Sequence, residues 1–158
     1  MREMALLAKV LTVSSSVHAG TRQNGTGPLL ARCLETANFV VVEEVVVPDG
    51  VAPVAHALRT MANGFAGLIV TTGGTGFAPT DLTPEATLSV IDREAPGLAE
   101  ATRTVSPFGG LSRGRAGTIA SCLVLNTPGS PQGALESLEA VLGLVPHALE
   151  LLSGGSPH

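Results

Sequence analysis

The chain has no tryptophan and no tyrosine, and its only aromatic residues are 4 phenylalanines among 158 positions. Proteins that bind single-stranded nucleic acid stack its bases on aromatic side chains, so that class is not expected here. Charge is also scarce: 14% of the residues are charged and the net charge is −4, which leaves no basic footprint for nucleic acid. Because Lys9 is the only lysine, a bound phosphate must meet backbone N–H groups, arginine or a metal ion.

Long apolar runs and paired cysteines are lacking too. No run reaches the ~20 apolar residues that a membrane-spanning helix needs, and residues 1–4 lead into a strand-like segment without a signal-peptide cleavage pattern. Cys33 and Cys122 lie in separate apolar segments, which predicts buried free thiols in a reducing compartment. The 4 histidines share no metal-ligand spacing, which argues against a zinc site. We therefore expect a cytoplasmic protein that binds neither membranes nor nucleic acid.

Apolar residues are abundant, at 44% of the chain, and they fall into segments of two alternating kinds. Continuous or β-branched runs predict strands at residues 5–14, 39–47, 67–72 and 118–125. Helical spacing predicts helices that start near Pro28, Val51, Thr83, Pro96 and Gly133, whereas residues 106–117 have no regular pattern. The alternation predicts an α/β domain with a largely parallel sheet covered on both faces. We assign residues 1–152 to a single domain and expect residues 153–158 to form a flexible tail.

A glycine-rich segment follows the third predicted strand. Thr72, Gly73, Gly74, Thr75 and Gly76 open a long loop that ends where Thr83 and Pro84 favour the start of a helix. Glycines leave backbone N–H groups bare and allow positive φ, so the loop can surround an anion, and a side chain at Gly74 would enter that space. The loop lacks the lysine of a P-loop. Phe77 either stacks on a ring of the ligand or forms a hydrophobic plug at the loop tip.

Two of the three aspartates stand at predicted strand ends. Asp49 follows the second strand and Asp81 closes the glycine-rich loop. Since ligands of parallel sheets bind outside the carboxyl ends of the strands, we expect both carboxylates near one site. Carboxylates beside anion-binding loops suggest Mg²⁺ and a phosphorylated ligand. A purely structural role is the alternative: Asp49 as a turn or helix-cap residue, and Asp81 as a cap partner of the helix at Thr83.

The sequence resembles the MoaB/Mog family of molybdenum cofactor biosynthesis proteins from about Val10 to Leu152. The segments that carry the resemblance are Pro48-Asp49, Thr72-Gly73-Gly74-Thr75-Gly76, Asp81-Leu82-Thr83-Pro84-Glu85-Ala86-Thr87, Leu111-Ser112-Arg113 with Ala116-Gly117, and Asn126-Thr127-Pro128-Gly129-Ser130-Pro131.

This resemblance implies a three-layer α/β/α sandwich with one antiparallel strand, assembled as a homotrimer. It implies a molybdopterin adenylyltransferase, which transfers AMP from Mg²⁺-bound ATP to the terminal phosphate of molybdopterin and passes the product on to a molybdenum-insertion partner. Asp49 and Asp81 are then the catalytic acids and the magnesium ligands. Substrate and nucleotide binding would fall to Thr72, Gly73, Gly74, Thr75, Gly76, Ser112, Asn126, Pro128, Gly129 and Ser130.

Two other functions fit the residues. Asn24 stands where the family usually has an acidic residue and Ser15 where it often has aspartate. These differences favour a non-catalytic molybdopterin-binding or scaffold protein of the same family. A more distant alternative is a phosphatase-like hydrolase that uses the same carboxylate and Mg²⁺ site. Pyrophosphate release from ATP that needs both molybdopterin and Mg²⁺ distinguishes the transferase from both.

Overall fold

The structure, a computed structural model that describes residues 5–155, is built on one six-stranded sheet. The strands are β1 (Leu6–Val13), β2 (Phe39–Val47), β3 (Gly67–Thr72), β4 (Arg93–Glu94), β5 (Ala116–Ile119) and β6 (Cys122–Thr127), in the order β2-β1-β3-β6-β5-β4. The pairs β1–β2, β1–β3 and β3–β6 are parallel, whereas β5 is antiparallel to both β6 and β4. The predicted α/β class, with a mostly parallel sheet and one antiparallel strand, is confirmed for the described residues.

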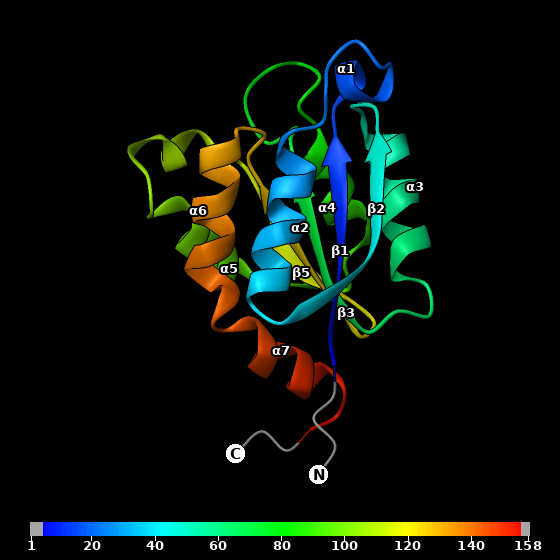
Figure 1. Ribbon diagram of the computed structural model, residues 1–158, viewed down its shortest axis with the longest axis vertical. Coiled ribbons are helices and arrows are strands. Elements are labelled where there is room, and N and C mark those ends of the chain that lie inside the picture. Colours follow the sequence, from blue (N-terminus) through cyan, green and yellow to red (C-terminus); the bar gives the residue numbers. More distant parts are fainter. Residues whose placement is uncertain (1–4, 156–158) are drawn as a thin grey trace.

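Helices cover both faces of this sheet and make a three-layer arrangement (Figure 1). The helices are α1 (Ser15–His18), α2 (Thr26–Thr36), α3 (Val51–Ala62), α4 (Thr83–Val90), α5 (Pro96–Arg103), the 3₁₀ helix η1 (Pro107–Leu111), α6 (Pro131–Leu142) and α7 (Val145–Leu152). Buried side chains of α2, α5, α6 and α7 pack on one face, and those of α3 and α4 pack on the other. No helix among residues 5–155 combines the length and the apolarity needed to cross a membrane.

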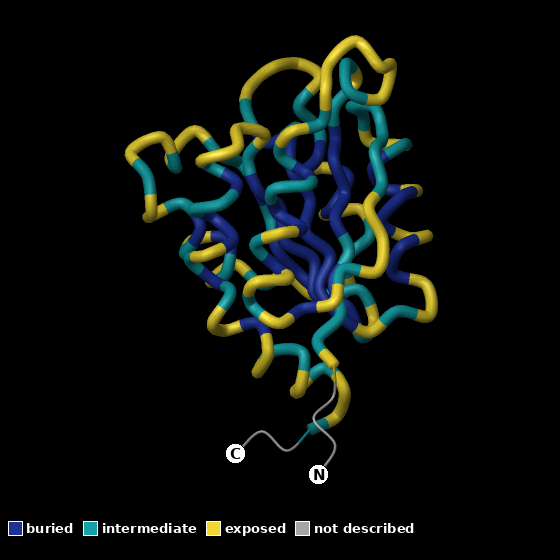
Figure 2. Tube along the Cα trace, viewed as in Figure 1, coloured by how far each residue is buried: buried dark blue, intermediate teal, exposed yellow. Residues whose placement is uncertain are grey.

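The central strand β3 is buried at every position. Leu68 and Val70 point into the cluster formed with α2, α5, α6 and α7, and Ile69 points into the cluster formed with α3 and α4. Each such side chain contributes roughly 1.5–3 kcal/mol by leaving water. Figure 2 shows the resulting buried layer running through the middle of the molecule. A strand that is buried on both faces has to be continuously apolar, which explains the Gly-Leu-Ile-Val pattern.

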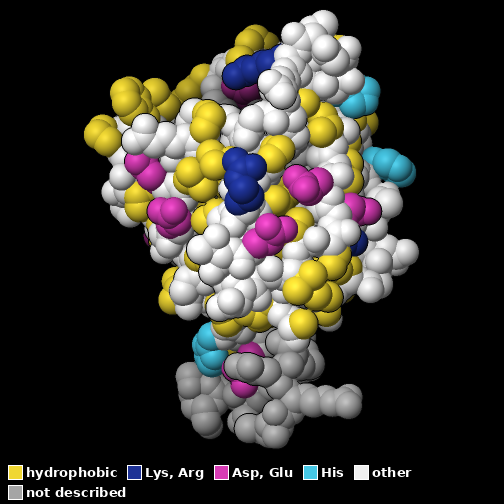
Figure 3. All heavy atoms as spheres, viewed as in Figure 1, with side chains coloured by type: hydrophobic (Ala, Val, Ile, Leu, Met, Phe, Trp, Pro, Cys, Tyr) yellow, Lys and Arg dark blue, Asp and Glu magenta, His cyan; other side chains and the backbone are white. Residues whose placement is uncertain are grey.

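Some apolar side chains stay at the surface. Val40 and Val42 of β2 are exposed, because this strand lies at an edge of the sheet. On the face of the molecule that α2 and α6 form, hydrophobic side chains lie scattered among acidic and basic ones (Figure 3). The apolar composition of the chain therefore extends beyond its core.

The strand predicted at residues 118–125 is wrong in its extent, because the structure has a β5–β6 hairpin there. The chain reverses at Ala120, which has a φ of 50°, and the Ala120 N–H donates to Asp92 Oδ2 at 2.6 Å. The turn contains neither glycine nor proline, and apolar residues lie on both sides of it. The sequence pattern therefore predicted one continuous strand. In the structure, Asn126 and Thr127 belong to β6 and not to the turn that was predicted there.

Smaller differences lie at helix starts. The predicted loop after the first strand contains the short helix α1, whose N-cap Ser14 accepts a hydrogen bond from the Val17 N–H. Helix α2 starts at Thr26, two residues before Pro28. Helix α6 starts at Pro131, because Ser130 caps it by accepting from the Gly133 N–H at 3.2 Å. Residues 153–155 hydrogen-bond back to α7, residues 156–158 lie outside the described residues, and the predicted tail stays a prediction.

Candidate functional site

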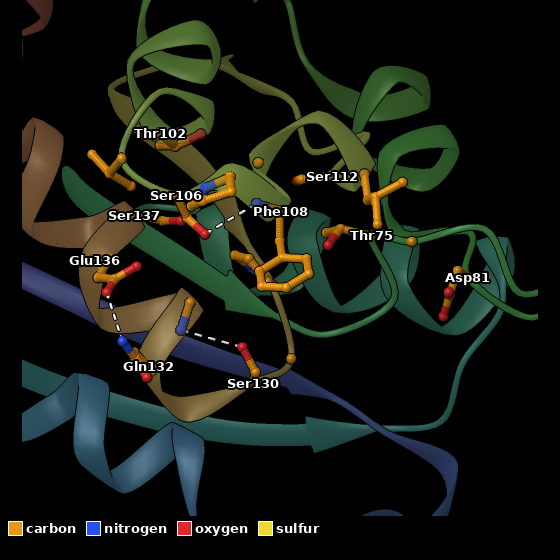
Figure 4. A pocket seen from close by; sticks show the side chains of 18 of the residues that line it. Thr75, Asp81, Thr102, Ser106, Phe108, Ser112, Ser130, Gln132, Glu136 and Ser137 are labelled. Carbon is orange, nitrogen blue, oxygen red and sulfur yellow. Dashed lines mark hydrogen bonds between the residues drawn. The ribbon is translucent and has the colours of Figure 1, made fainter.

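A cleft of about 630 Å³ opens beside the carboxyl ends of β3 and β6. Its walls are the glycine-rich loop after β3, the η1 segment, and the first half of α6 (Figure 4). Of the predicted site residues, the cleft is lined by Gly74, Thr75, Gly76, Asp81, Ser112, Pro128, Gly129 and Ser130. The glycine-rich loop, the Pro128–Ser130 turn and Ser112, which lie far apart in the sequence, therefore meet in one cavity.

Close packing fixes the first two glycines of the loop. Gly73 and Gly74 have φ values of 98° and 69°, which favour glycine. A Cβ on Gly73 would lie 2.2 Å from the Val13 carbonyl oxygen, and one on Gly74 would lie 2.3 Å from Thr83 Oγ1. Thr83 also holds the loop, donating from Oγ1 to the Gly73 carbonyl at 2.9 Å and from its N–H to the Gly74 carbonyl at 3.0 Å. These glycines are thus required by the packing of β1 and α4 against the loop.

Arg113 holds the rest of the loop through four groups. Its backbone N–H donates to the Thr75 carbonyl at 2.8 Å, and Nε donates to the Gly76 carbonyl at 2.8 Å. Nη2 donates to the Asp81 carbonyl at 2.6 Å, while Nη1 pairs with Glu85 Oε1. This hydrogen bond from Arg113 holds the pKa of the Glu85 carboxyl below its ordinary value. Arg113 therefore fixes the conformation of the loop, but it is not among the residues that line the cleft.

Asp81 presents its carboxylate at the cleft. Oδ2 accepts a hydrogen bond from the Ala78 N–H at 3.0 Å, and a Cβ on Gly76 would lie 2.9 Å from the same oxygen. Gly76 thus leaves the space that Asp81 occupies. Together with Glu136, Asp81 is one of two charged side chains that line the cleft, and both are acidic.

Asp49 lies apart from this cleft, after β2 rather than β3. Its Oδ2 accepts from both the N–H and the Oγ of Ser15, at 3.1 and 3.0 Å, and the Asp49 N–H donates to Ser15 Oγ at 3.0 Å. Asp49 and Asp81 both lie at the carboxyl edge of the sheet, but β1 separates their strands.

A shared magnesium site for Asp49 and Asp81 stays a prediction. Within residues 5–155 no group of three or more His, Cys, Asp or Glu side chains is placed to hold a metal ion. Mg²⁺ usually binds through one or two carboxylates together with water and substrate phosphates. The single carboxylate of Asp81 in a cleft of this size fits a magnesium ion that arrives with a nucleotide, rather than a metal site made by the protein alone.

Two predicted binding residues lie behind the cleft and tie the strand ends together. The buried Asn126 amide donates to Thr71 Oγ1 and Thr87 Oγ1, both at 3.0 Å, and its Oδ1 accepts from the Arg115 N–H at 2.9 Å. Thr72 Oγ1 donates to the Pro128 carbonyl at 2.7 Å. Through these bonds the two residues position the Pro128–Ser130 turn and the end of β3; a direct role in binding stays a prediction.

The N-terminus of α6 faces the cleft through Ser130 and Gly133. This helix is 12 residues long and carries no acidic residue in its first turn. Helix N-termini attract anions, because their first N–H groups lack helical partners and the helix dipole is positive there. With Arg113 and Arg115 paired to Glu85 and Glu94, this helix end is the main positive feature at the cleft.

Other lining residues were not predicted from the sequence. They are Thr102, Val105, Ser106, Pro107, Phe108, Gly109, Leu111, Gln132, Gly133, Glu136 and Ser137. Phe77, the predicted stacking or plugging residue, is 70% exposed and does not line the cleft, whereas Phe108 does. Only the pair Ser130-Pro131 could have indicated some of these residues from the sequence. Serine followed by proline favours a helix start, and a helix that starts there places Gln132 and Glu136 one turn apart on a common face.

Comparisons with known proteins point to molybdenum cofactor biosynthesis. The family described as "Probable molybdopterin binding domain" matches residues 9–147. The molybdopterin adenylyltransferase of Haemophilus influenzae is 36% identical over 173 residues, covering 96% of this chain and 87% of that protein. The molybdenum cofactor synthesis protein cinnamon of Drosophila melanogaster is also 36% identical, but this chain spans only 25% of its length.

The fold also matches a solved structure throughout. The molybdopterin biosynthesis enzyme MoaB from Thermus thermophilus has 45% sequence identity and a TM-score of 0.89, with 97% of this chain and 99% of that chain covered. The similarity thus extends over nearly the whole of both chains.

Proposed function

The chain belongs to the MogA/MoaB family of molybdopterin-binding domains in molybdenum cofactor biosynthesis, and from this premise we propose that it is a molybdopterin adenylyltransferase. In this reaction an oxygen of the terminal phosphate of molybdopterin attacks the α-phosphorus of ATP. The bond from that phosphorus to the bridging oxygen breaks, and pyrophosphate leaves. The product carries AMP on the former terminal phosphate.

The observation that carries the proposal is the cleft, which joins a glycine-rich loop, the N-terminus of α6 and the carboxylate of Asp81. Nucleotidyl transfer needs positioning and charge stabilisation more than a covalent side chain. At the start of α6, Pro131 has no N–H and the Gly133 N–H donates to Ser130 Oγ, so it is the positive end of the helix dipole that suits a phosphate of either substrate. A volume of about 630 Å³ accommodates a substrate of nucleotide or pterin size.

The charge of the cleft favours a metal-bound nucleotide. Both charged lining residues, Asp81 and Glu136, are acidic, so bare phosphates would be repelled. We propose that Asp81, together with Asp49 at the end of the strand on the other side of β1, holds magnesium; when bound, Mg²⁺ neutralises phosphate charge and acts as a Lewis acid. The protein's part is to hold the loop: Arg113 and Thr83 fix the backbone around the reacting phosphates, and Gly76 leaves room for the Asp81 carboxylate.

The resemblance also supports three further proposals: a homotrimer, a cytoplasmic location, and transfer of the adenylylated pterin to a molybdenum-insertion partner. The apolar composition of 44% is compatible with self-association.

The test is pyrophosphate release from ATP. We expect release only when molybdopterin and Mg²⁺ are both present, with one pyrophosphate for each adenylylated pterin. ATP loss without molybdopterin would instead support the hydrolase, and tight molybdopterin binding without pyrophosphate would support the non-catalytic protein.

The non-catalytic alternative has an observation of its own. Asn24, which replaces the usual acidic residue, is engaged locally: its Nδ2 donates to Thr12 Oγ1 at 3.3 Å and its Oδ1 accepts from the Gly27 N–H at 3.2 Å. Asn24 therefore supports the start of α2 and supplies no carboxylate. The transferase remains our conclusion, because Asp81 and the loop that presents it are both in place.

A further inference from the structure

Ser15 and Asp49 come from two different loops and are joined by three hydrogen bonds. The N–H and the Oγ of Ser15 both donate to Asp49 Oδ2, at 3.1 and 3.0 Å, and the Asp49 N–H donates to Ser15 Oγ at 3.0 Å. Helix α1, which starts at Ser15, contacts β2 and lies beside the end of that strand in Figure 1. One serine therefore holds both the side chain and the backbone of Asp49.

The backbone around this pair is fixed on both sides. The Ser14 N–H donates to the Val47 carbonyl at 2.9 Å, which joins the ends of β1 and β2, and Ser14 Oγ caps α1 by accepting from the Val17 N–H. On the other side, Gly50 has a φ of 128°, which favours glycine, and α3 starts directly after it. The serine and the aspartate are therefore held in place by the fold itself, before any ligand binds.

Asp49 keeps one carboxylate oxygen free. Both bonds from Ser15 go to Oδ2, and no donor among residues 5–155 reaches Oδ1. Asp49 also takes part in none of the ion pairs of the described residues. A carboxylate that ligates a metal ion is usually held by hydrogen bonds from the protein, and Mg²⁺ takes one or two such carboxylates. The half-buried Asp49 has this form, with one oxygen held and the other open.

The hydroxyl of Ser15 makes a contact that an aspartate at this position cannot make. An ionised aspartate accepts hydrogen bonds but does not donate them, so it would accept from the Asp49 N–H and leave Oδ2 without the hydroxyl donor. It would also place a second negative charge beside Asp49. Serine at residue 15, where the family often has aspartate, therefore supplies Asp49 with a donor, and this difference by itself does not indicate a non-catalytic protein.

We propose that Ser15 is a positioning residue for Asp49: its N–H and hydroxyl hold Oδ2, which leaves Oδ1 free for the magnesium ion that arrives with ATP. This assignment rests on the proposed function, since it needs Asp49 as a magnesium ligand. Ser15 acts through Asp49 and is not itself a catalytic residue. The structural alternative is that the pair only fastens α1 to the turn after β2, in which case its loss would affect unfolding but not the binding of metal-bound ATP.

The first measurement is calorimetric titration with Mg²⁺-ATP in the absence of molybdopterin, so that the result does not depend on turnover. Ser15→Ala removes the hydroxyl and keeps the N–H, and the affinity should fall about fivefold. Ser15→Thr keeps a hydroxyl and should stay within about twofold of wild type. The control is Ser16→Ala, because the Ser16 hydroxyl lies 3.2 Å from Ser14 Oγ and makes no bond to Asp49. An unchanged affinity in Ser15→Ala, or an equal loss in Ser16→Ala, would overturn the proposal.

A double-mutant cycle shows whether Ser15 acts through Asp49. Asp49→Asn should weaken Mg²⁺-ATP binding at least as much as Ser15→Ala does. In the Asp49→Asn background, Ser15→Ala should cause no further loss, because the charge that Ser15 orients is already gone. Additive losses of affinity would contradict the assignment, and so would a wild-type protein that binds Mg²⁺-ATP no more tightly than Asp49→Asn. A lower Tm with unchanged affinity in Ser15→Ala would support the structural alternative instead.

Pyrophosphate release with molybdopterin distinguishes this assignment from the proposed function. Coupled losses of Mg²⁺-ATP affinity at Ser15 and Asp49, without any pyrophosphate from the wild-type protein, would remove adenylyl transfer and keep the role of Ser15. Molybdopterin-dependent pyrophosphate release with the same rate and the same dependence on Mg²⁺ concentration in wild type and Ser15→Ala would keep the function and remove the role of Ser15.

Discussion

Arg113 Nε donates a hydrogen bond of 2.8 Å to the carbonyl oxygen of Gly76, although 37 positions separate the two residues in the sequence. The same guanidinium reaches the Asp81 carbonyl, so one side chain holds both ends of the segment that carries the cleft carboxylate. The irregular segment after α5 thereby determines where Asp81 lies. Arg113 thus orders the loop that we propose to bind phosphate.

We expect Arg113→Gln to weaken nucleotide and molybdopterin binding by about tenfold or more, since the loop carbonyls lose their charged donor. The free energy of unfolding should fall by about 2 kcal/mol, which lowers Tm by about 4–8 °C in a chain of this size. Calorimetric titration and thermal unfolding measure both quantities. Arg115→Gln is the control, because Arg115 pairs with the exposed Glu94 and such surface pairs contribute about 0–1 kcal/mol. Equal effects of the two changes would contradict the role of Arg113.

Asp49→Asn and Asp81→Asn should each slow adenylyl transfer on the order of a hundredfold or more, which corresponds to a loss of about 3 kcal/mol of transition-state stabilisation. Tm should hardly change, because an amide oxygen can still accept from Ser15 in the first case and from the Ala78 N–H in the second. The measurements are initial rates and thermal unfolding of both variants. Near-normal rates in both would show that the two aspartates are structural and that the active centre lies elsewhere.

Cys122 makes stability depend on pH above 9. Burial raises the pKa of its thiol from the ordinary 9.0 to about 11. The native state therefore keeps its proton while the unfolded chain loses it, and the free energy of unfolding should fall as pH rises from 9 to 11, by up to ~2.7 kcal/mol for this difference in pKa. The chain lacks tyrosine and has one lysine, so few other groups titrate in this window.

Urea unfolding under reducing conditions, at several values between pH 8 and pH 11, measures this dependence. Cys122→Ala should flatten the curve, whereas Cys33→Ala should leave most of it, because Cys33 is only half-buried. The same slope in wild type and Cys122→Ala would show that another group is responsible.

Light scattering should give a mass three times that of one chain at micromolar concentration. The family resemblance and the apolar composition motivate this expectation. A monomer mass at that concentration would exclude the trimer.

The sequence predicted the sheet where burial leaves a clear pattern. Strand β3 begins with the continuous apolar run Gly67–Val70 because both of its faces are covered, and β2 and β3 were placed with the bounds that the structure has. The β5–β6 hairpin was missed because its turn at Ala120 depends on a tertiary contact with Asp92 rather than on glycine or proline. The spacing of apolar residues along the sequence does not indicate a contact between residues as far apart as Ala120 and Asp92.

For the site, eight of the residues predicted from the sequence line the cleft, but the sequence did not predict the directions of the side chains. Gly74 was expected to leave space for an anion, whereas a Cβ there would meet Thr83, so a change at Gly74 would disturb the loop itself. Cys122 is buried as predicted, and Cys33 is only half-buried. Phe108 and Glu136 carry no local motif, and only the packing of η1 and α6 around the cleft brings them together.

The strand order governs how the chain can fold while it is being synthesised. Strands β1, β2 and β3 are complete at Thr72, but β6, which pairs along the other side of β3, begins at Cys122. A ribosome-bound chain thus holds an open strand edge next to Leu68 and Val70 for about fifty further residues. We expect chains truncated before Cys122 to bind a hydrophobic dye and to aggregate, whereas chains that extend through α6 should do neither. We therefore expect nascent chains of this protein to need chaperones mainly while residues 73–121 are being synthesised.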